Sequence, residues 1–177
     1  MRRVAVIASA SGNGKTTFGR ALAERLDVRF VELDALVHGP NWTETPDDEL
    51  RALVETIVRS DAWVIDGTYW RKIGRLVLDA ADTVVWLDLP LRVWLPRLLR
   101  RTWRRRLERE PLWNDNRETL RNAFWGRESL FVFAFRSHFE RRRTWPTELA
   151  AYPVVRLRTA EQVDRWLNDV AADRGVR

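Results

Sequence analysis

Short apolar runs alternate with stretches of helical spacing along most of the chain. The runs are apolar throughout rather than alternating with polar residues, which is typical of parallel strands covered on both faces. Five such runs predict strands, at 4–8, 28–33, 62–65, 83–87 and 154–157. Segments of helical spacing follow them, at about 18–26, 46–59, 70–80, 90–107, 117–142 and 161–172. The pattern predicts one α/β domain over residues 1–177 with right-handed crossovers.

Turn and capping residues set the expected element boundaries. Residues 35–45 carry turn chemistry and predict a loop. Thr45 is the expected N-cap of the next helix, with Pro46 at its first helical position. Trp145-Pro146 is expected to end the long aromatic helix, because proline removes a backbone donor. Thr159 and Gln162 predict a capping box for the final helix.

The segment after the first strand has the order that a phosphate-binding loop needs. A small-residue loop over 9–14 leads into Lys15 and Thr16 and then into a helix. Gly12 and Gly14 allow positive φ, and the loop N–H groups form an anion nest at the helix N-terminus. Lys15 is expected to reach the β- and γ-phosphates, and Thr16 to coordinate Mg²⁺. The predicted nucleotide-binding residues are Ser9, Ala10, Ser11, Gly12, Asn13, Gly14, Lys15, Thr16 and Thr17.

The loop departs from the usual G-x-x-x-x-G-K-[ST] pattern at one position. Ser9 stands where the first glycine is expected. Serine can make the same turn if its backbone stays in an ordinary region, so we interpret it as a tolerated variant. The alternative is a glycine-rich turn that only packs a helix on a strand. Lys15 is one of two lysines among 31 basic residues, which favours a specific use of its compact ammonium group.

Composition narrows the class of protein. No cysteine is present, which excludes disulfide frameworks and thiolate metal sites. The formal charge of +6, carried almost entirely by arginine, indicates anionic ligands. The sequence shows neither a signal peptide nor a membrane-spanning run, so we expect a cytoplasmic protein with no membrane partner. The sequence leaves the oligomeric state open.

The residues resemble the adenylate kinase-like group of nucleoside and nucleotide kinases, and within it the branch named "DNA topology modulation protein". The resemblance rests on the strings ASASGNGKTTFGRALAERL, VELDAL, AWVIDGTYWRKIGRLVLDAADTVVWLDLPLRVWLPRLLRR and VVRLRTAEQVDRWL. It implies a three-layer P-loop fold whose five-stranded parallel sheet has the order 2-3-1-4-5. It also implies ATP and Mg²⁺ as cofactors and phosphoryl transfer to a small acceptor.

The resemblance also implies roles for individual residues. Asp66 resembles the strand-end aspartate that holds Mg²⁺, usually through water. Arg71 lies one residue away from the position where the group keeps an arginine for the acceptor's phosphate. Arg97 and Arg101 fall where the group places arginines over the adenine and on the phosphates. Asp34 lies where related small-molecule kinases, such as shikimate kinase, use an aspartate near the acceptor hydroxyl.

Several of these residues also have a simpler interpretation. Asp66 ends a strand at the ligand-binding edge of the sheet, but it could cap the next loop. Asp34 could be a general base, a substrate-binding residue or a solvated turn residue. Asp88 is expected to be structural. We expect His38 to lie on the surface and His138 to be packed or solvated rather than catalytic.

Arginines gather in the run 97–109, within a helical, lid-like region predicted over about 97–145. The functional interpretation is a lid that closes over ATP, because a guanidinium can hold two oxygens of the transferring phosphoryl group. A solvated helix face is the alternative, and interleaved leucines predict that one side packs. A nucleic-acid-binding patch is a third interpretation.

These observations predict an ATP- and Mg²⁺-dependent kinase. Its acceptor would be a nucleoside, a nucleotide or a hydroxyl metabolite, bound between 34–45 and 66–75. Trp42, Tyr69 and Trp70 are candidate stacking surfaces there. The alternative function is a nucleotide-gated nucleic-acid-binding or regulatory protein that uses the basic run.

Overall fold

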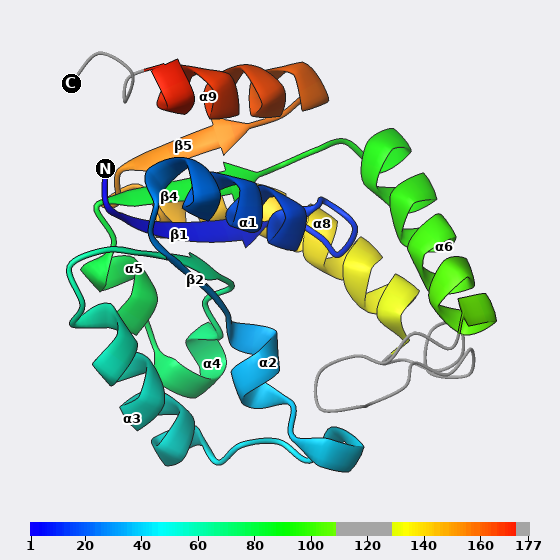
Figure 1. The fold of residues 1–177 in the computed structure, drawn as a ribbon. Helices are drawn as coiled ribbons and strands as arrows, with labels where there is room; N and C mark the ends of the chain where they lie inside the picture. Colours follow the sequence, from blue (N-terminus) through cyan, green and yellow to red (C-terminus); the bar gives the residue numbers. More distant parts are fainter. Residues whose placement is uncertain (109–128, 173–177) are drawn as a thin grey trace.

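Five parallel strands form one sheet in the order β2-β3-β1-β4-β5, which confirms the predicted fold class (Figure 1). The computed structural model describes residues 1–108 and 129–172. The strands are β1 (Arg3–Ala8), β2 (Arg29–Glu32), β3 (Trp63–Asp66), β4 (Thr83–Leu87) and β5 (Val154–Leu157). The helices are α1 (Lys15–Leu26), α2 (Leu33–Val37), η1 (Pro40–Trp42), α3 (Asp47–Val58), α4 (Trp70–Ile73), α5 (Leu76–Ala80), α6 (Leu91–Glu108), α8 (Leu130–Glu148) and α9 (Ala160–Ala172).

Helices cover both faces of the sheet, so that the molecule has three layers. Successive residues of β1 point to opposite faces. Val4 and Val6 pack with α1 and α9, whereas Ala5 and Ile7 pack with α3, α5 and Trp145 near the end of α8. Buried side chains on both faces explain why the strands are apolar throughout.

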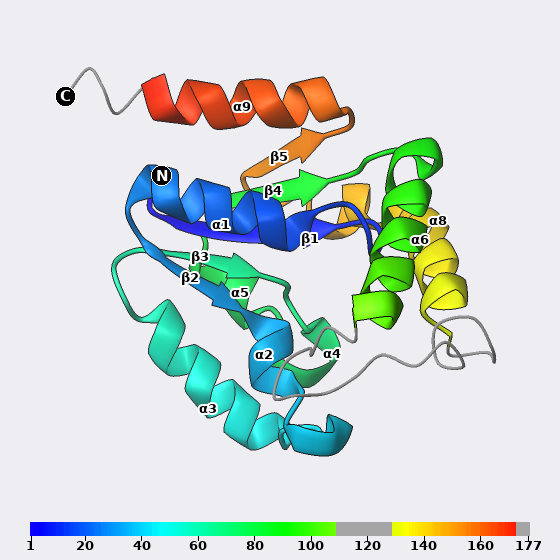
Figure 2. The same ribbon diagram turned by 45° about the vertical axis from the view of Figure 1, so that its right-hand side comes forward.

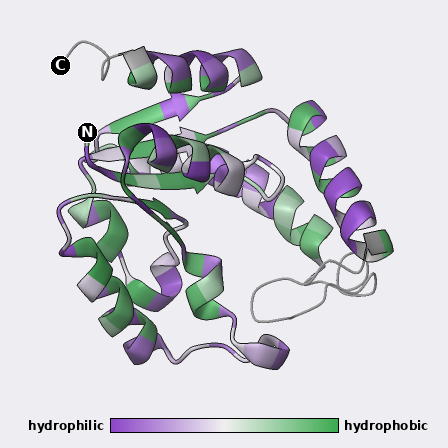
Figure 3. Cartoon of the chain, in the orientation of Figure 1, coloured by the Kyte–Doolittle hydropathy of each residue, from purple (hydrophilic) through white to green (hydrophobic). Residues whose placement is uncertain are grey.

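Helices α6 and α8 lie beside the carboxyl ends of the strands (Figure 2). They pack together with the loop after β1 through a small cluster of Ala10, Trp94, Leu98 and Ala134. Hydrophilic residues dominate the second half of α6 (Figure 3). No helix in the described part of the chain is long and apolar enough to cross a membrane.

The segment after β2 differs from the prediction. Residues 35–45 were predicted as a loop, but a helix, α2, and a 3-10 turn, η1, occupy much of this range. Leu33 and Val37, four positions apart, are both fully buried, so packing favours a helical turn here. The predicted N-cap was also wrong: Pro46 occupies the N-cap position of α3, and the Thr45 hydroxyl donates to the Leu36 carbonyl at 2.6 Å.

Two further boundaries differ because tertiary structure overrides local signals. The single helix predicted over 70–80 is two helices, separated where Gly74 adopts φ 64°. Helix α8 continues through Pro146 and ends at Glu148, although Pro146 was predicted to stop it. Trp145 is 6% exposed. Its ring centroid lies 5.6 Å from that of Trp70 and 5.4 Å from that of Trp86. This packing holds the last turn in helical form despite the missing donor.

The capping box at the start of α9 is formed in part. The Gln162 N–H donates to the Thr159 hydroxyl at 3.2 Å, as predicted. The Gln162 side chain accepts from the Arg158 N–H at 2.7 Å, one residue before the expected partner. The predicted lid-like region over 97–145 includes residues 109–128, which lie outside the described residues, as does the first part of the helix predicted over 117–142. The lid therefore stays a prediction.

Replacement of the buried tryptophan near the end of α8 should destabilise the fold. We expect Trp145→Ala to lower the free energy of unfolding by about 3–5 kcal/mol, because it leaves a cavity between Trp70 and Trp86. Phe139→Ala on the same helix is the control, because Phe139 is 61% exposed, and we expect it to cost less than about 1 kcal/mol. Urea denaturation measures both, and equal losses would contradict the packing argument.

A buried histidine between α6 and α8 should make stability depend on pH. His138 contacts Trp94 Nε1 at 3.2 Å, and burial and the nearby Arg142 lower its pKa below the ordinary value of 6.5, against the opposing effect of Asp88. The folded protein therefore binds this proton less readily than the unfolded chain, so stability falls as the pH drops through about 6.5. We expect His138→Gln to flatten the dependence of Tm on pH between about 7.5 and 5.5. An unchanged slope in His138→Gln, or an equal flattening in His38→Gln, would contradict this.

Candidate active site

The loop between β1 and α1 has the backbone of an anion-binding nest. Gly12 and Gly14 both adopt φ 85°, in the left-handed region that favours glycine. A Cβ at Gly14 would meet no atom within 4 Å, so the loop is open there, whereas a Cβ at Gly12 would lie 2.6 Å from the Trp94 carbonyl oxygen. The loop therefore packs against α6 at Gly12, whereas the space at Gly14 is open to a ligand.

Side chains within the loop hold its shape. Asn13 is 3% exposed, and its amide donates to the Ala10 carbonyl at 2.8 Å and accepts from the Leu89 N–H at 2.9 Å. Ser9 is fully buried, has no positive φ, and donates its N–H to the Leu87 carbonyl at 3.1 Å. Serine thus makes the turn in an ordinary backbone conformation. The Ser9 amide and the Asn13 side chain are used within the protein, which leaves later N–H groups of the loop for an anion.

Lys15 and Thr16 converge on Asp66 at the end of β3. The Lys15 ammonium forms an ion pair with one carboxylate oxygen of Asp66, and the Thr16 hydroxyl donates to the other at 2.7 Å. Asp66 is 1% exposed. The three residues predicted to hold phosphate and metal are thus brought together.

Glu32 joins this group, and the sequence analysis missed it. It is the last residue of β2, aligned with Asp66 of β3 in the parallel register, and its carboxylate lies 3.2 Å from the Thr16 hydroxyl. Arg20 of α1 pairs with its other oxygen at 3.4 Å. The available signal was its position at a strand end on the same sheet edge as Asp66.

The donor set fits a nucleotide with Mg²⁺. Magnesium prefers oxygen ligands and is usually held by one or two carboxylates together with phosphate oxygens and water. Thr16, Asp66 and Glu32 supply one hydroxyl and two carboxylates, and the described residues contain no group of three or more acidic, histidine or cysteine side chains that would form a complete cage. The open cradle at Gly14 lies in the same loop and suits a phosphate.

Asp34 and Tyr69 form a pair on the neighbouring part of the same edge. The Tyr69 hydroxyl donates to Asp34 at 2.6 Å. Tyr69 adopts φ 44° directly before α4, an uncommon conformation for a bulky residue that places its ring by local strain. Burial and the Asp34 carboxylate raise the pKa of Tyr69 far above its ordinary value, so Tyr69 remains a proton donor to Asp34.

The other predicted residues lie at more scattered places. Trp42 is 40% exposed in η1, with its ring edge-on to His38. Arg71 is exposed on α4 and forms no ion pair within the described residues. Arg97 and Arg101 lie on α6, near Leu98, whose side chain abuts the loop at Gly12. Their roles stay predictions.

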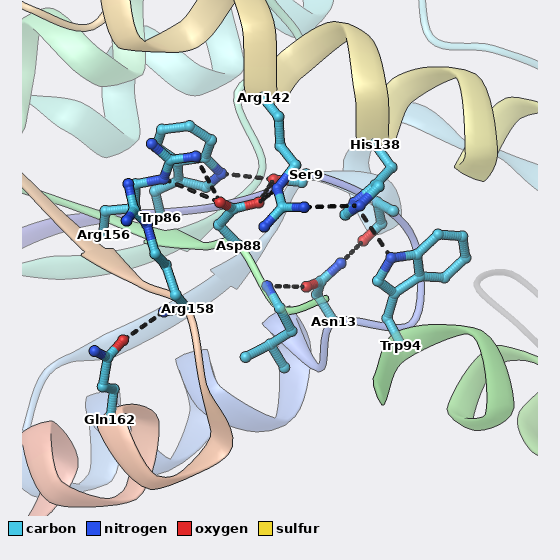
Figure 4. A network of polar contacts seen from close by, with 12 residues as sticks. Ser9, Asn13, Trp86, Asp88, Trp94, His138, Arg142, Arg156, Arg158 and Gln162 are labelled. Atoms are coloured by element: carbon cyan, nitrogen blue, oxygen red, sulfur yellow. Dashed lines mark hydrogen bonds and ion pairs between the residues drawn. The ribbon is translucent and has the colours of Figure 1, made fainter. Parts of the chain in front are cut away.

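Asp88 lies at the centre of a buried polar network behind the loop (Figure 4). It is fully buried and accepts from the Ser9 hydroxyl at 2.6 Å, from Arg142 Nε at 2.8 Å and from Arg156 at 2.6 and 3.0 Å. This environment agrees with the structural role expected for it. The sequence analysis assigned no role to Arg156, although an arginine within the apolar run 154–157 was a signal for a buried charge.

Arg141 is a cation without a carboxylate partner in the described part of the chain. It donates to the Ala8 carbonyl, the last residue of β1, at 2.8 Å, and its guanidinium lies over the Trp145 ring at 5.1 Å. Burial lowers its pKa from the ordinary value. Among the described residues, this half-buried arginine contacts a carbonyl and ring faces, so it places positive charge beside the start of the loop.

Comparisons with known proteins agree with this geometry. A model of the family "Shikimate kinase" matches residues 11–44. The shikimate kinase of Sulfurihydrogenibium sp. (strain YO3AOP1) is 28% identical over 137 residues, which span 70% of this chain and 79% of that protein. The shikimate kinase of Persephonella marina is 25% identical over 142 residues, spanning 70% and 80% of the two chains.

Solved structures share the fold at lower identity. A shikimate kinase from Bacteroides thetaiotaomicron superposes with a TM-score of 0.59 at 14% identity and covers 98% of each chain. A gluconokinase from Sinorhizobium meliloti 1021 gives 0.53 at 19% identity, covering 97% of this chain and 90% of its own. The sequence matches and the loop geometry identify the chain as an ATP-dependent small-molecule phosphotransferase of the adenylate kinase-like P-loop type.

Proposed function

We propose that the chain transfers the γ-phosphoryl group of ATP·Mg²⁺ to a hydroxyl group of a small acceptor. One observation carries the proposal: Lys15 and Thr16 meet at Asp66, and the Asp34–Tyr69 pair lies on the adjoining part of the same sheet edge. The first group suits the phosphates and the metal, and the second suits a hydroxyl. Phosphoryl transfer needs chiefly this positioning and charge stabilisation.

The loop residues would hold the phosphates. Backbone N–H groups of the loop after Ser9 would donate to the phosphate oxygens, and the Lys15 ammonium would exchange its contact with Asp66 for phosphate oxygens. Thr16 and Asp66 would hold Mg²⁺, and Glu32 would hold a water of its shell. When bound, the metal withdraws negative charge from the phosphate oxygens.

Asp34 would accept a hydrogen bond from the acceptor hydroxyl and orient it for attack. Tyr69 fixes the Asp34 carboxylate from the other side, since its proton stays on the phenol. The Arg141 guanidinium lies over Trp145, and Trp145 contacts Trp70, the residue next to Tyr69. Its positive charge would favour an acceptor with a negative group. The curated relatives are named shikimate kinases, which further supports hydroxy acids among the acceptors.

Helix α6 would act as one side of a lid, in which Arg97 and Arg101 stabilise the charge of the transferring group. The strings VIDGTY and WLDLP support membership of the DNA topology modulation branch within the wider kinase group.

The alternative function is that of a nucleic-acid-binding protein, and the basic run 97–109 is the feature that supports it. Binding of duplex DNA that weakens steeply with salt, without acceptor-dependent ATP turnover, would favour that alternative.

Removal of the loop lysine should abolish catalysis. We expect Lys15→Ala to lower acceptor-dependent release of ADP by at least about 100-fold, because the transferring phosphates lose their ammonium partner. The assay measures ADP formed from ATP·Mg²⁺ with a panel of nucleosides, nucleoside monophosphates, sugars and hydroxy acids. Arg165→Ala is the control, since Arg165 is an exposed cation on α9, outside both segments predicted to bind the acceptor. Full turnover in Lys15→Ala, or no stimulation of the wild type by any acceptor, would contradict the proposal.

Loss of the Asp34 carboxylate should affect the acceptor and spare the nucleotide. We expect Asp34→Asn to lower kcat/KM for the acceptor by about 100-fold or more, with KM for ATP changed less than about threefold. The chain offers a matched pair for control, because the Tyr152 hydroxyl donates to Asp79 at the same 2.6 Å on the surface. Steady-state kinetics of Asp34→Asn and Asp79→Asn compare the two pairs. An equal effect of both substitutions would remove Asp34 from the acceptor site.

A further inference from the structure

Two consecutive arginines of α8 hold two consecutive residues at the start of the phosphate loop. Arg141 donates to the carbonyl of Ala8 at 2.8 Å. Arg142 donates to Asp88 at 2.8 Å, and the same carboxylate oxygen accepts from the hydroxyl of Ser9 at 2.6 Å (Figure 4). Helix α8 is therefore attached to the junction of β1 and the loop by two adjacent contacts. Arg141 bonds directly to Ala8, and Arg142 is linked to Ser9 through Asp88.

The contact through Asp88 is a strong one. Asp88 is fully buried, and its two oxygens accept four hydrogen bonds from Ser9, Arg142 and Arg156. Charge-assisted hydrogen bonds of this kind are roughly twice as strong as neutral ones. Asp88 is fully buried while its arginine partners are partly exposed, so loss of a partner would leave the Asp88 charge less compensated inside the protein. The network therefore resists separation of α8 from the loop.

Ser9 supplies a link that glycine could not supply. Its hydroxyl donates to Asp88 and accepts from Trp86 Nε1 at 2.8 Å, so both of its hydrogen-bonding functions are used. Glycine, the usual residue at this position of the loop, would leave both Trp86 and Asp88 short of one buried partner. The hydroxyl is fully buried and already bonded to Asp88 and Trp86, so it is not free to hold phosphate.

We propose that Ser9 and Asp88 are positioning residues that make the phosphate loop and helix α8 a single rigid unit. Their effect is to keep the Arg141 guanidinium at a fixed place relative to the bound phosphates while other parts of the site move. The catalytic part of this inference rests on the proposed function. The mechanical part, the attachment of α8 to the loop, does not.

Hydrogen exchange of the free protein tests the mechanical part. We expect Ser9→Ala to speed exchange of the α8 backbone amides over 138–148 by about tenfold and to leave those of α9 unchanged, since local opening of α8 becomes easier. Ser60→Ala is the control, because the exposed Ser60 hydroxyl donates to the Ile57 carbonyl within the same turn. Unchanged exchange of α8 in Ser9→Ala would overturn the proposal.

Binding of Mg²⁺·ADP, measured by calorimetry, separates positioning from nucleotide binding. We expect its affinity in Ser9→Ala and Ser9→Gly to stay within about threefold of the wild type, while kcat falls by at least about tenfold. A large loss of ADP affinity would make Ser9 a nucleotide-binding residue, and wild-type kcat in Ser9→Gly would show that the hydroxyl is dispensable. Either result would overturn the proposal.

A double-mutant cycle tests whether Ser9 acts through α8. We expect Ser9→Ala to slow turnover little further once Arg142→Gln has been made, because both changes break the same connection. Independent losses that multiply would overturn the proposal. If no acceptor stimulates the wild type, the cycle is run on the exchange rates of α8, so that failure of the proposed function leaves this test intact.

Discussion

A parallel sheet brings the carboxyl ends of all its strands to one edge, and the candidate site depends on this constraint. Glu32 and Asp66 are aligned by the β2–β3 register, and Asp66 in turn lies beside Val6 of β1, three residues before the loop begins. The sheet alone brings these carboxylates next to the loop after β1, so their position does not depend on contacts made by the loop. Residues far apart in the chain thus meet without any motif that joins them.

The sequence predicted the parts of the fold that follow from local pattern. Five apolar runs and the small-residue loop before Lys15 predict the strands and the P-loop. The strand order was implied by the resemblance to the kinase group, and the sheet has that order. Asp66 was identifiable because it ends an apolar run at the ligand-binding edge. These features depend on neighbouring residues or on a single topological rule, so a linear reading finds them.

The features that the sequence did not predict depend on distant partners. Pro146 stays helical because Trp145 packs between Trp70 and Trp86, and none of these contacts is local. Leu33–Val37 folds as a helix because two of its residues are fully buried. Arg142 resembles any other arginine in a basic chain until the fold brings α8 beside Asp88 at the end of β4. The apolar neighbours of Arg156 mark it as a buried charge, but only the pairing of β4 with β5 shows that Asp88 is its partner.

The contact of three indoles, Trp70, Trp145 and Trp86, gives the protein an optical property. The ring centroids of Trp70 and Trp145 lie 5.6 Å apart, and those of Trp145 and Trp86 lie 5.4 Å apart. The row runs from the residue next to Tyr69 to the hydrogen bond between Trp86 and Ser9. At such separations, light absorbed by one ring is shared with its neighbours before it is emitted. The ultraviolet emission of the row is therefore a shared signal, which a change in the surroundings of Trp70 or of Trp86 would alter.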